Sequence, residues 1–202
     1  INLQETTAAK EKIESELQIA RNIQQGIIPK IFPPFPHRDD LDLYAILEPA
    51  RDVGGDLYDF FFLDKVHLCF TIGDVSGKGV PASLFMAITR TLISARMESG
   101  SKPGDVMKAM NEELCQDNEN AMFVTLFLGI LNVDTGKLEY CNAGHNYPIL
   151  LNAGGETHEL NMTHGTPLGA MPGVPFGSSE IRITKGDRIV LYTDGVSEAV
   201  NE

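Results

Sequence analysis

Three aspartates stand beside glycine at the points where apolar, strand-like runs begin or end. Asp56 follows two glycines in VGGDLYD, Asp74 follows one in GDVSGKG, and Asp194 precedes one at the end of RIVLYTDG. Magnesium and manganese prefer oxygen ligands, and their protein sites usually combine a few carboxylates with water. Glycine lets the backbone come close to a ligand. A single Gly-Asp pair is most often a plain turn, so it is the repetition of the pattern that favours a divalent cation site.

The elements that must position these aspartates are mostly β-like. Turn signals separate eight runs with the texture of strands: LDLYAILEPA, LYDFFFL, KVHLCFTIGDV, FVTLFLGILNV, KLEYCNAG, YPILLN, SEIRIT and DRIVLYTDG. The turn at residues 134–136, Asp-Thr-Gly, predicts a hairpin between two of them. Helical patterns cover residues 80–97 and 102–117. Strands, then two helices, then more strands predict an α+β domain whose helices cover a mainly antiparallel sheet system.

Residues 5–28 predict one helix ahead of a proline-rich break, PKIFPPFPHRDD, in which a helix cannot continue. The apolar residues of this helix recur every three or four positions and form a narrow stripe: Ile13, Leu17, Ala20, Ile23 and Ile27. The stripe is typical of an amphipathic helix packed on its own domain, and also of a coiled-coil linker from an upstream module. We favour the linker, because a narrow stripe suits a helix as its partner.

The chain is acidic and lacks the sequence features typical of exported or membrane proteins. Its 202 residues include 28 acidic and 16 basic ones, for a formal net charge of −12. This balance argues against a nucleic-acid partner, because phosphate backbones need a basic surface. The sequence has no apolar run of the roughly 18 residues that span a membrane and no signal-peptide core at its start. Cys69, Cys115 and Cys141 fit neither a zinc site nor a disulfide framework, which predicts reduced thiols in a cytoplasmic protein.

Five motifs follow one another in an order known from one family: VGGDLYD, GDVSGKGVPASLFM, NAGHNYPILL, GTPLGAMPG and LYTDGVSEAVN. With them the chain resembles the bacterial metal-dependent serine phosphatases of the PPM superfamily, SpoIIE/RsbU type. The resemblance covers nearly the whole chain and implies a sandwich of two antiparallel β-sheets flanked by helices. It divides the chain into an N-terminal coiled-coil or linker helix at residues 1–30 and a phosphatase domain at residues 31–202. The family carries a further metal-ligating aspartate after TDGVSEA, which we expect beyond Glu202 together with the last strand.

The same resemblance implies a catalytic site with two ions, Mn²⁺ or Mg²⁺. Asp74 would bridge both ions, and the carbonyl of Val75 would help at one of them. Asp56 would bind one ion, directly or through water, and Asp194 would hold the other.

Two residues near the first motif have alternative readings. Arg51 lies five residues before Asp56 and either contacts the phosphate of a substrate, as arginines at anion sites do, or is a solvated surface arginine. Asp59 is either an outer-shell carboxylate of the metal site or the cap of a turn.

The function implied by the resemblance is hydrolysis of phosphoserine or phosphothreonine on a protein. The expected substrate is a small anti-sigma-factor antagonist of the STAS fold, in a bacterial partner-switching pathway. The N-terminal helix would connect the domain to an upstream sensor or regulatory domain, and it offers a seam for a homodimer. Two rival readings stay open: a catalytically silent relative that serves as a signalling scaffold, and a metal-dependent nuclease or nucleotide hydrolase. The intact aspartates argue against the first, and the acidity of the chain argues against the second.

Overall fold

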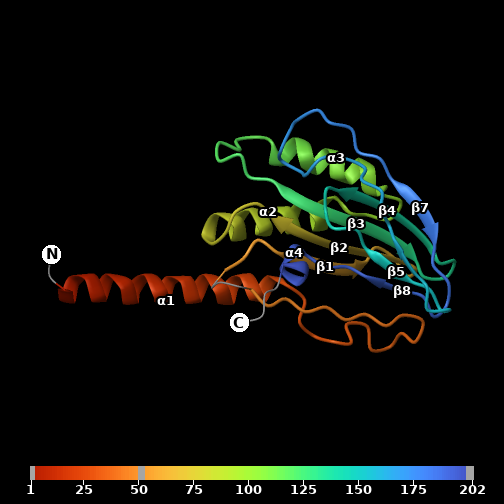
Figure 1. The fold of residues 1–202 in the computed structure, drawn as a ribbon, viewed down its shortest axis with the longest axis horizontal. Coiled ribbons are helices and arrows are strands. Elements are labelled where there is room, and N and C mark those ends of the chain that lie inside the picture. The colour runs from red at the N-terminus through yellow and green to blue at the C-terminus, as the bar shows by residue number, and fades with distance from the viewer. Residues whose placement is uncertain (1–2, 50–52, 199–202) are drawn as a thin grey trace.

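The computed structural model describes residues 3–49 and 53–198. Its first element is the long helix α1, Leu3–Ile27, which projects from the body of the molecule (Figure 1). Ile13 and Ile23 of the predicted stripe are 57% and 62% exposed, whereas Leu17, Ala20 and Ile27 are half-buried. The end of α1 is anchored on the domain, because Gln24 is buried and so is Ile28, directly after the helix.

The centre of the fold is a five-stranded antiparallel sheet in the order β1-β2-β3-β4-β7. Its strands are β1 (Leu57–Phe62), β2 (His67–Val75), β3 (Val124–Asn132), β4 (Lys137–Ala143) and β7 (Ser179–Arg182). The predicted hairpin joins β3 to β4, with Gly136 at a φ of 72°, a conformation that glycine adopts readily. Two pairs of the register matter for the site: Leu57 lies opposite Gly73, and Asp74 lies opposite Thr125.

A second, three-stranded antiparallel sheet has the order β6-β5-β8. It contains β5 (Ile149–Leu151), β6 (Thr157–Glu159) and β8 (Arg188–Val190). Apolar side chains from both sheets form one cluster, in which Phe127 and Tyr140 of the large sheet meet Leu150 and Ile189 of the small one. The two sheets therefore form a sandwich.

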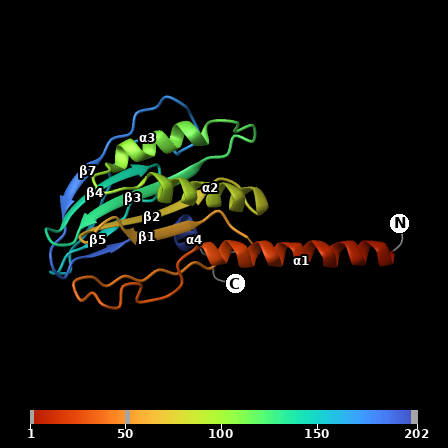
Figure 2. The ribbon, with the colours of Figure 1, turned by 180° about the vertical axis from the view of Figure 1, so that it is seen from behind.

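Two helices cover the large sheet: α2 (Val80–Arg96) and α3 (Pro103–Leu114). Figures 1 and 2, which view the molecule from opposite sides, both show them along this sheet. Each helix has a proline in its first turn, where the missing N–H costs nothing. Their buried faces are mainly apolar, with Thr89 and Asn111 as buried polar residues. The apolar members are Ala82, Met86 and Ile93 in α2, and Val106, Met107, Met110 and Leu114 in α3. The expected α+β sandwich of antiparallel sheets with flanking helices is confirmed, and so is the N-terminal helix.

The strand prediction was wrong at one place. LDLYAILEPA was expected to be a strand, but its described part, residues 41–49, is extended without pairing to any strand among the described residues. Leu41, Leu43 and Leu47 still pack against the main core, while Tyr44 and Ile46 are 72% and 65% exposed. The alternating sequence thus sets which side chains face inward, but a strand also needs a neighbour for its hydrogen bonds. The short strand β6 was not foreseen.

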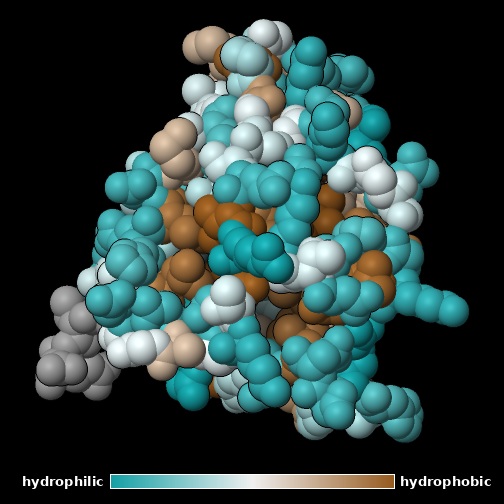
Figure 3. Space-filling view, turned by 90° about the vertical axis from the view of Figure 1, so that its right-hand side faces the viewer, coloured by the Kyte–Doolittle hydropathy of each residue, from teal (hydrophilic) through white to brown (hydrophobic). Residues whose placement is uncertain are grey.

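The end of the molecule opposite the start of α1 is largely hydrophilic, with apolar residues visible between the polar ones (Figure 3). No helix in the described part of the chain is both long and apolar enough to cross a membrane.

Candidate metal centre

Asp56 and Asp74 meet because of the pairing of β1 with β2. Asp56 directly precedes β1, and Asp74 is the second-last residue of β2. Since Leu57 pairs with Gly73, the start of one strand lies beside the end of the other. The two carboxyl groups are close enough to share a hydrogen bond when one of them carries a proton.

Asp194 joins this pair from the other sheet. It is the first residue of the short helix α4 (Asp194–Ser197), which follows β8 and lies near β1 in both Figure 1 and Figure 2. The hydroxyl of Thr193, directly before Asp194, donates a 3.4 Å hydrogen bond to Oδ2 of Asp56. The negative charge of Asp194 also raises the pKa of both Asp56 and Asp74. Of the three aspartates singled out in the sequence, Asp56 and Asp74 thus lie together, and Asp194 is near enough for its charge to act on both.

The electrostatics of this cluster are unfavourable for three negative charges. Burial raises the pKa of Asp74 to about 7, with further increases from the charges of Asp56 and Asp194. The pKa of Asp56 is also raised, first by burial and then by Asp194, against the hydrogen bonds from Asp74 and Thr193. Crowded carboxylates stay ionised only when a positive charge compensates them. A divalent cation would replace the shared proton, as metal binding to carboxylates generally does.

The carboxylate oxygens are suitable ligands for such a cation, but the three side chains do not surround a common point. Within residues 3–49 and 53–198, no three His, Cys, Asp or Glu side chains are arranged so that they could hold a metal ion. Asp56 and Asp74 are in direct contact, whereas Asp194 is more exposed and acts on them through its charge. Asp56 and Asp74 with water would still suffice for magnesium, which is usually bound by one or two carboxylates and several waters.

Two glycines allow the backbone to close around the aspartates. A Cβ on Gly55 would lie 2.7 Å from the carbonyl oxygen of Val75, so the Asp56 segment packs directly on the carbonyl that was predicted to help at one ion. A Cβ on Gly73 would lie 2.7 Å from the backbone oxygen of Thr125 and 2.6 Å from Leu126. The glycines of the two Gly-Asp motifs are therefore needed for packing of backbone on backbone.

The two remaining candidates have different outcomes. Asp59 lies in β1 and is 4% exposed; its Oδ2 is 3.0 Å from Nε of Arg90 in α2, and its Oδ1 accepts a hydrogen bond from the backbone of Phe60. Burial raises the pKa of Asp59, and Arg90 opposes this. None of these contacts reaches the three clustered aspartates, so Asp59 connects β1 to α2. Arg51 lies outside the described residues.

Sequence reasoning missed three contributors to this site. Thr193 could have been suspected only from its place beside Asp194. Gln24 of α1 makes two hydrogen bonds to the backbone of Gly54. His145 is 4% exposed and lies against Thr125, the partner of Asp74 in the sheet. The sequence has no periodic or spacing signal for the last two, because both act across long separations.

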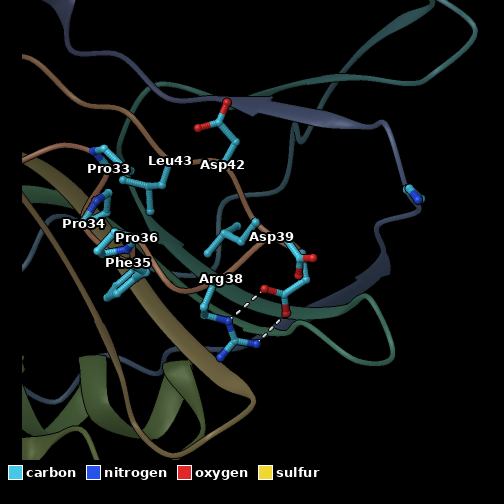
Figure 4. Close-up of a pocket in the computed structure, with 11 residues that line it drawn as sticks. Pro33, Pro34, Phe35, Pro36, Arg38, Asp39, Asp42 and Leu43 are labelled. Carbon is cyan, nitrogen blue, oxygen red and sulfur yellow. Dashed lines mark hydrogen bonds and ion pairs between the residues drawn. The ribbon is translucent and has the colours of Figure 1, made fainter.

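A cavity away from the three aspartates lies beside the proline-rich segment. It has a volume of about 450 Å³ and is lined by residues of the proline-rich segment 33–43 together with Lys185. In Figure 4 Pro33, Pro34, Phe35 and Pro36 line one part of it, and Arg38 forms an ion pair with Asp40. None of the three clustered aspartates borders this cavity.

Comparison with known proteins decides the family. The sequence model of the family described as Stage II sporulation protein E (SpoIIE) matches residues 64–202, which include Asp74 and Asp194. The chain belongs to the SpoIIE family. It is a PPM-type phosphatase domain of the SpoIIE/RsbU type.

Relatives of this SpoIIE-family domain extend the match toward its N-terminus. It is 35% identical over 213 residues to Protein IcfG of Synechocystis sp. (strain ATCC 27184 / PCC 6803 / Kazusa), covering 91% of the chain and 33% of IcfG. It is 33% identical over 194 residues to Phosphoserine phosphatase RsbU of Bacillus subtilis (strain 168), covering 96% of the chain and 56% of RsbU. The chain thus spans a third to about half of these relatives.

Solved structures share the fold. The SiaA-PP2C domain of Pseudomonas aeruginosa superposes with a TM-score of 0.76 at 22% identity, over 93% of the chain and 74% of that domain. The crystal structure of RsbX in complex with magnesium superposes with a TM-score of 0.62 at 18% identity, over 75% of the chain and 72% of RsbX.

Proposed function

We propose that this domain hydrolyses phosphoserine or phosphothreonine esters on a protein, with two divalent cations, Mn²⁺ or Mg²⁺, held by Asp56, Asp74 and Asp194. The observation that carries the proposal is the contact of Asp56 with Asp74 beside Asp194, three carboxylates whose mutual repulsion calls for positive charge. Membership of the SpoIIE family and similarity to the phosphoserine phosphatase RsbU support the reaction type. The magnesium complex of RsbX, a protein of the same fold, supports a divalent cation.

The charge balance agrees with an anionic substrate. Two divalent cations would bring four positive charges to three aspartates, so the site would be mildly positive within a protein of net charge −12. When bound, the cations supply an activated water and stabilise charge on the phosphoryl oxygens, the terms that dominate phosphoryl transfer.

In this proposal, the protein's own groups hold and orient the reacting centre. Asp74 has the central role, because the negative charges of both Asp56 and Asp194 act on it. The carbonyl of Val75, which packs against Gly55, would assist at one ion. Thr193 connects the segment bearing Asp194 to Asp56 and so sets the distance between the two halves of the site. Arg51 remains our candidate for a phosphate contact.

For the substrate we propose a phosphorylated STAS-type antagonist of an anti-sigma factor, acting in partner switching. The support is the similarity to RsbU, which reaches 96% of this chain. We further propose that residues 1–30 form a linker that receives a signal from an upstream domain and can pair in a homodimer, while residues 31–202 form the phosphatase domain. The exposure of Ile13 and Ile23 on α1 supports both roles of the linker.

The proposed activity can be tested with three substrates in parallel. A Mn²⁺ titration should stimulate hydrolysis of a phosphoserine peptide and of p-nitrophenyl phosphate, and leave DNA intact. Hydrolysis of DNA would favour the nuclease reading instead. If neither phosphate ester is hydrolysed at any Mn²⁺ or Mg²⁺ concentration, although the protein is folded and binds a phosphorylated STAS domain, the chain is a signalling scaffold.

A further inference from the structure

His145 lies at the junction of the two halves of the candidate metal centre. It follows β4, and its side chain is 4% exposed. The amide of Asn142, itself fully buried, holds the backbone of His145 on both sides: Oδ1 accepts from the His145 N–H at 2.7 Å, and Nδ2 donates to its carbonyl at 3.0 Å. The ring therefore extends from a fixed backbone.

One side of the ring faces the strand that bears Asp74. Nδ1 of His145 is 2.9 Å from the hydroxyl of Thr125. Thr125 is the register partner of Asp74, and its hydroxyl is 3.3 Å from the carbonyl oxygen of Asp74. The hydroxyl of Thr125 thus connects the imidazole of His145 to the backbone of Asp74.

The other side of the ring faces the segment that bears Asp194. Nε2 is buried and has no partner that meets hydrogen-bond geometry in the described part of the chain. Burial lowers the pKa of His145 to about 4, while the backbone of Tyr192 and the charge of Asp194 counteract this. Because Nδ1 is turned to Thr125, these two groups indicate that residues 192–194 lie on the Nε2 side of the ring. A buried ring nitrogen without a hydrogen-bond partner is costly. A histidine that served only to fill the core would not need to bear this cost.

We propose that His145 is a positioning residue of the metal centre, which ties the segment bearing Asp194 to the strand bearing Asp74. In this arrangement the neutral ring carries its proton on Nε2, directed at the backbone carbonyl of Tyr192. Nδ1 then accepts the one hydroxyl proton of Thr125, whose oxygen is nearer to Nδ1, at 2.9 Å, than to the Asp74 carbonyl, at 3.3 Å. His145 touches neither substrate nor cation in this role, because its Nε2 is shielded from solvent. The inference deepens the proposed function and rests on its metal site.

The first test determines the tautomer in the wild-type protein. ¹⁵N NMR of the imidazole nitrogens should show the proton of His145 on Nε2 at neutral pH. Addition of Mg²⁺, which is diamagnetic, should shift the Nε2–H resonance as residues 192–194 settle. A proton on Nδ1 would overturn the proposal, because Nε2 could then donate nothing to Tyr192.

The second test uses two amide substitutions that differ in reach. His145→Asn keeps a polar group near Nδ1 but none near Nε2, whereas His145→Gln places an N–H donor near Nε2. Groups that orient metal ligands typically change metal affinity by about 10–100-fold. We therefore expect His145→Asn to weaken Mn²⁺ binding about tenfold or more, and His145→Gln to bind within about threefold of wild type. Binding is measured by the EPR signal of free Mn²⁺, with the melting temperature of the cation-free variants as the folding control.

The outcomes separate this role from the proposed function. If the wild type binds Mn²⁺ and both variants bind equally well, or are weakened equally, His145 has no positioning role at Nε2, while the metal site stands. If the wild type binds neither Mn²⁺ nor Mg²⁺, the proposed metal centre and this inference both fall. If the variants do not fold, the tautomer of His145 in the wild-type protein still decides whether the positioning role is correct.

Discussion

The side-chain amide of Gln24 is hydrogen-bonded at both ends to the backbone of Gly54. Nε2 donates to the Gly54 carbonyl at 2.5 Å, and Oε1 accepts from the Gly54 N–H at 3.1 Å. Gln24 lies near the end of α1, and Gly54 comes two residues before Asp56. Close by, the hydroxyl of Tyr58 donates to the carbonyl of Pro29 at 2.6 Å. A displacement of α1 would therefore act directly on the segment that carries a predicted metal ligand.

Gln24→Ala tests this connection. Loss of the amide leaves the Gly54 backbone without two partners, and an unpaired buried polar group costs about 1–3 kcal/mol. We expect a lower free energy of unfolding in urea by about this amount and a higher Mn²⁺ concentration at half-maximal phosphatase activity. The matched control is Gln25→Ala, since Gln25 makes only an exposed hydrogen bond with Lys30. Equal effects of the two substitutions would show that the amide of Gln24 has no special role.

Asp74→Asn should be the most damaging change among the three aspartates. Asparagine keeps the shape but removes a negative charge from the centre of the cluster. Loss of one transition-state charge contact typically costs about 3 kcal/mol, or about a hundredfold in rate, and we expect at least that loss together with weaker Mn²⁺ binding. Phosphoserine-peptide hydrolysis is measured over a Mn²⁺ titration, with Asp134→Asn in the exposed hairpin turn as control. Activity within a few-fold of wild type, at an unchanged Mn²⁺ midpoint, would rule out the two-cation assignment.

The same aspartate should make the cation-free fold sensitive to pH. The unfolded chain loses the Asp74 proton near pH 4, whereas the folded protein keeps it until about pH 7. Between these values the folded state binds more protons, so the stability of the wild type falls as the pH rises and the loss is complete above about pH 7.

Asp74→Asn removes this penalty. In EDTA we expect the free energy of unfolding of the variant, relative to that of the wild type, to rise by about 1–2 kcal/mol between pH 4 and pH 8. This value is reduced for solvent screening, because Asp74 is half-buried. Urea unfolding of both proteins across this range gives the difference. A difference that does not change with pH would mean that the pKa of Asp74 is not raised in the fold.

Gly55→Ala should disturb the site through packing alone. The Cβ of the new alanine would lie 2.7 Å from the carbonyl oxygen of Val75. Real Cβ atoms do not come so close to another atom, so the backbone must shift. Overpacking of this kind typically costs about 1–3 kcal/mol. The neighbouring Gly54→Ala is the control, since its Cβ would meet only Pro49 at 3.8 Å. The melting temperature and the Mn²⁺ affinity should both fall for Gly55→Ala and change little for Gly54→Ala. Larger losses for Gly54→Ala than for Gly55→Ala would contradict the described packing.

Ile13→Glu tests the dimer seam on α1. Ile13 is 57% exposed, so the monomer gains nothing from its apolar side chain, while a helix partner would bury it. A charge in such a seam is costly when unpaired, and we expect weaker self-association in sedimentation. Ser15→Glu, off the stripe, should leave association unchanged. A wild type that stays monomeric at all concentrations would remove the basis for a dimer.

The sequence by itself determined the elements whose signals are local. Proline in the first turn and an apolar face at helical spacing predicted α2 and α3, and Asp-Thr-Gly predicted the turn between β3 and β4. The Gly-Asp motifs likewise pointed to three aspartates, and the resemblance that begins from these motifs named the family. These patterns are readable because the residue that carries the signal and the structure that it favours lie within a few positions of one another.

Tertiary structure decided everything that depends on a distant partner. Residues 41–49 have the alternation of a strand, yet no strand among the described residues pairs with them. Asp59 could not be assigned from its place beside Asp56, because only the packing of α2 on β1 supplies Arg90 as its partner. Gln24 and His145 contact the site across 30 and 20 residues, to Gly54 and Thr125. A hydrogen bond across such a distance leaves no periodic trace in the sequence, because its geometry exists only after the chain has folded.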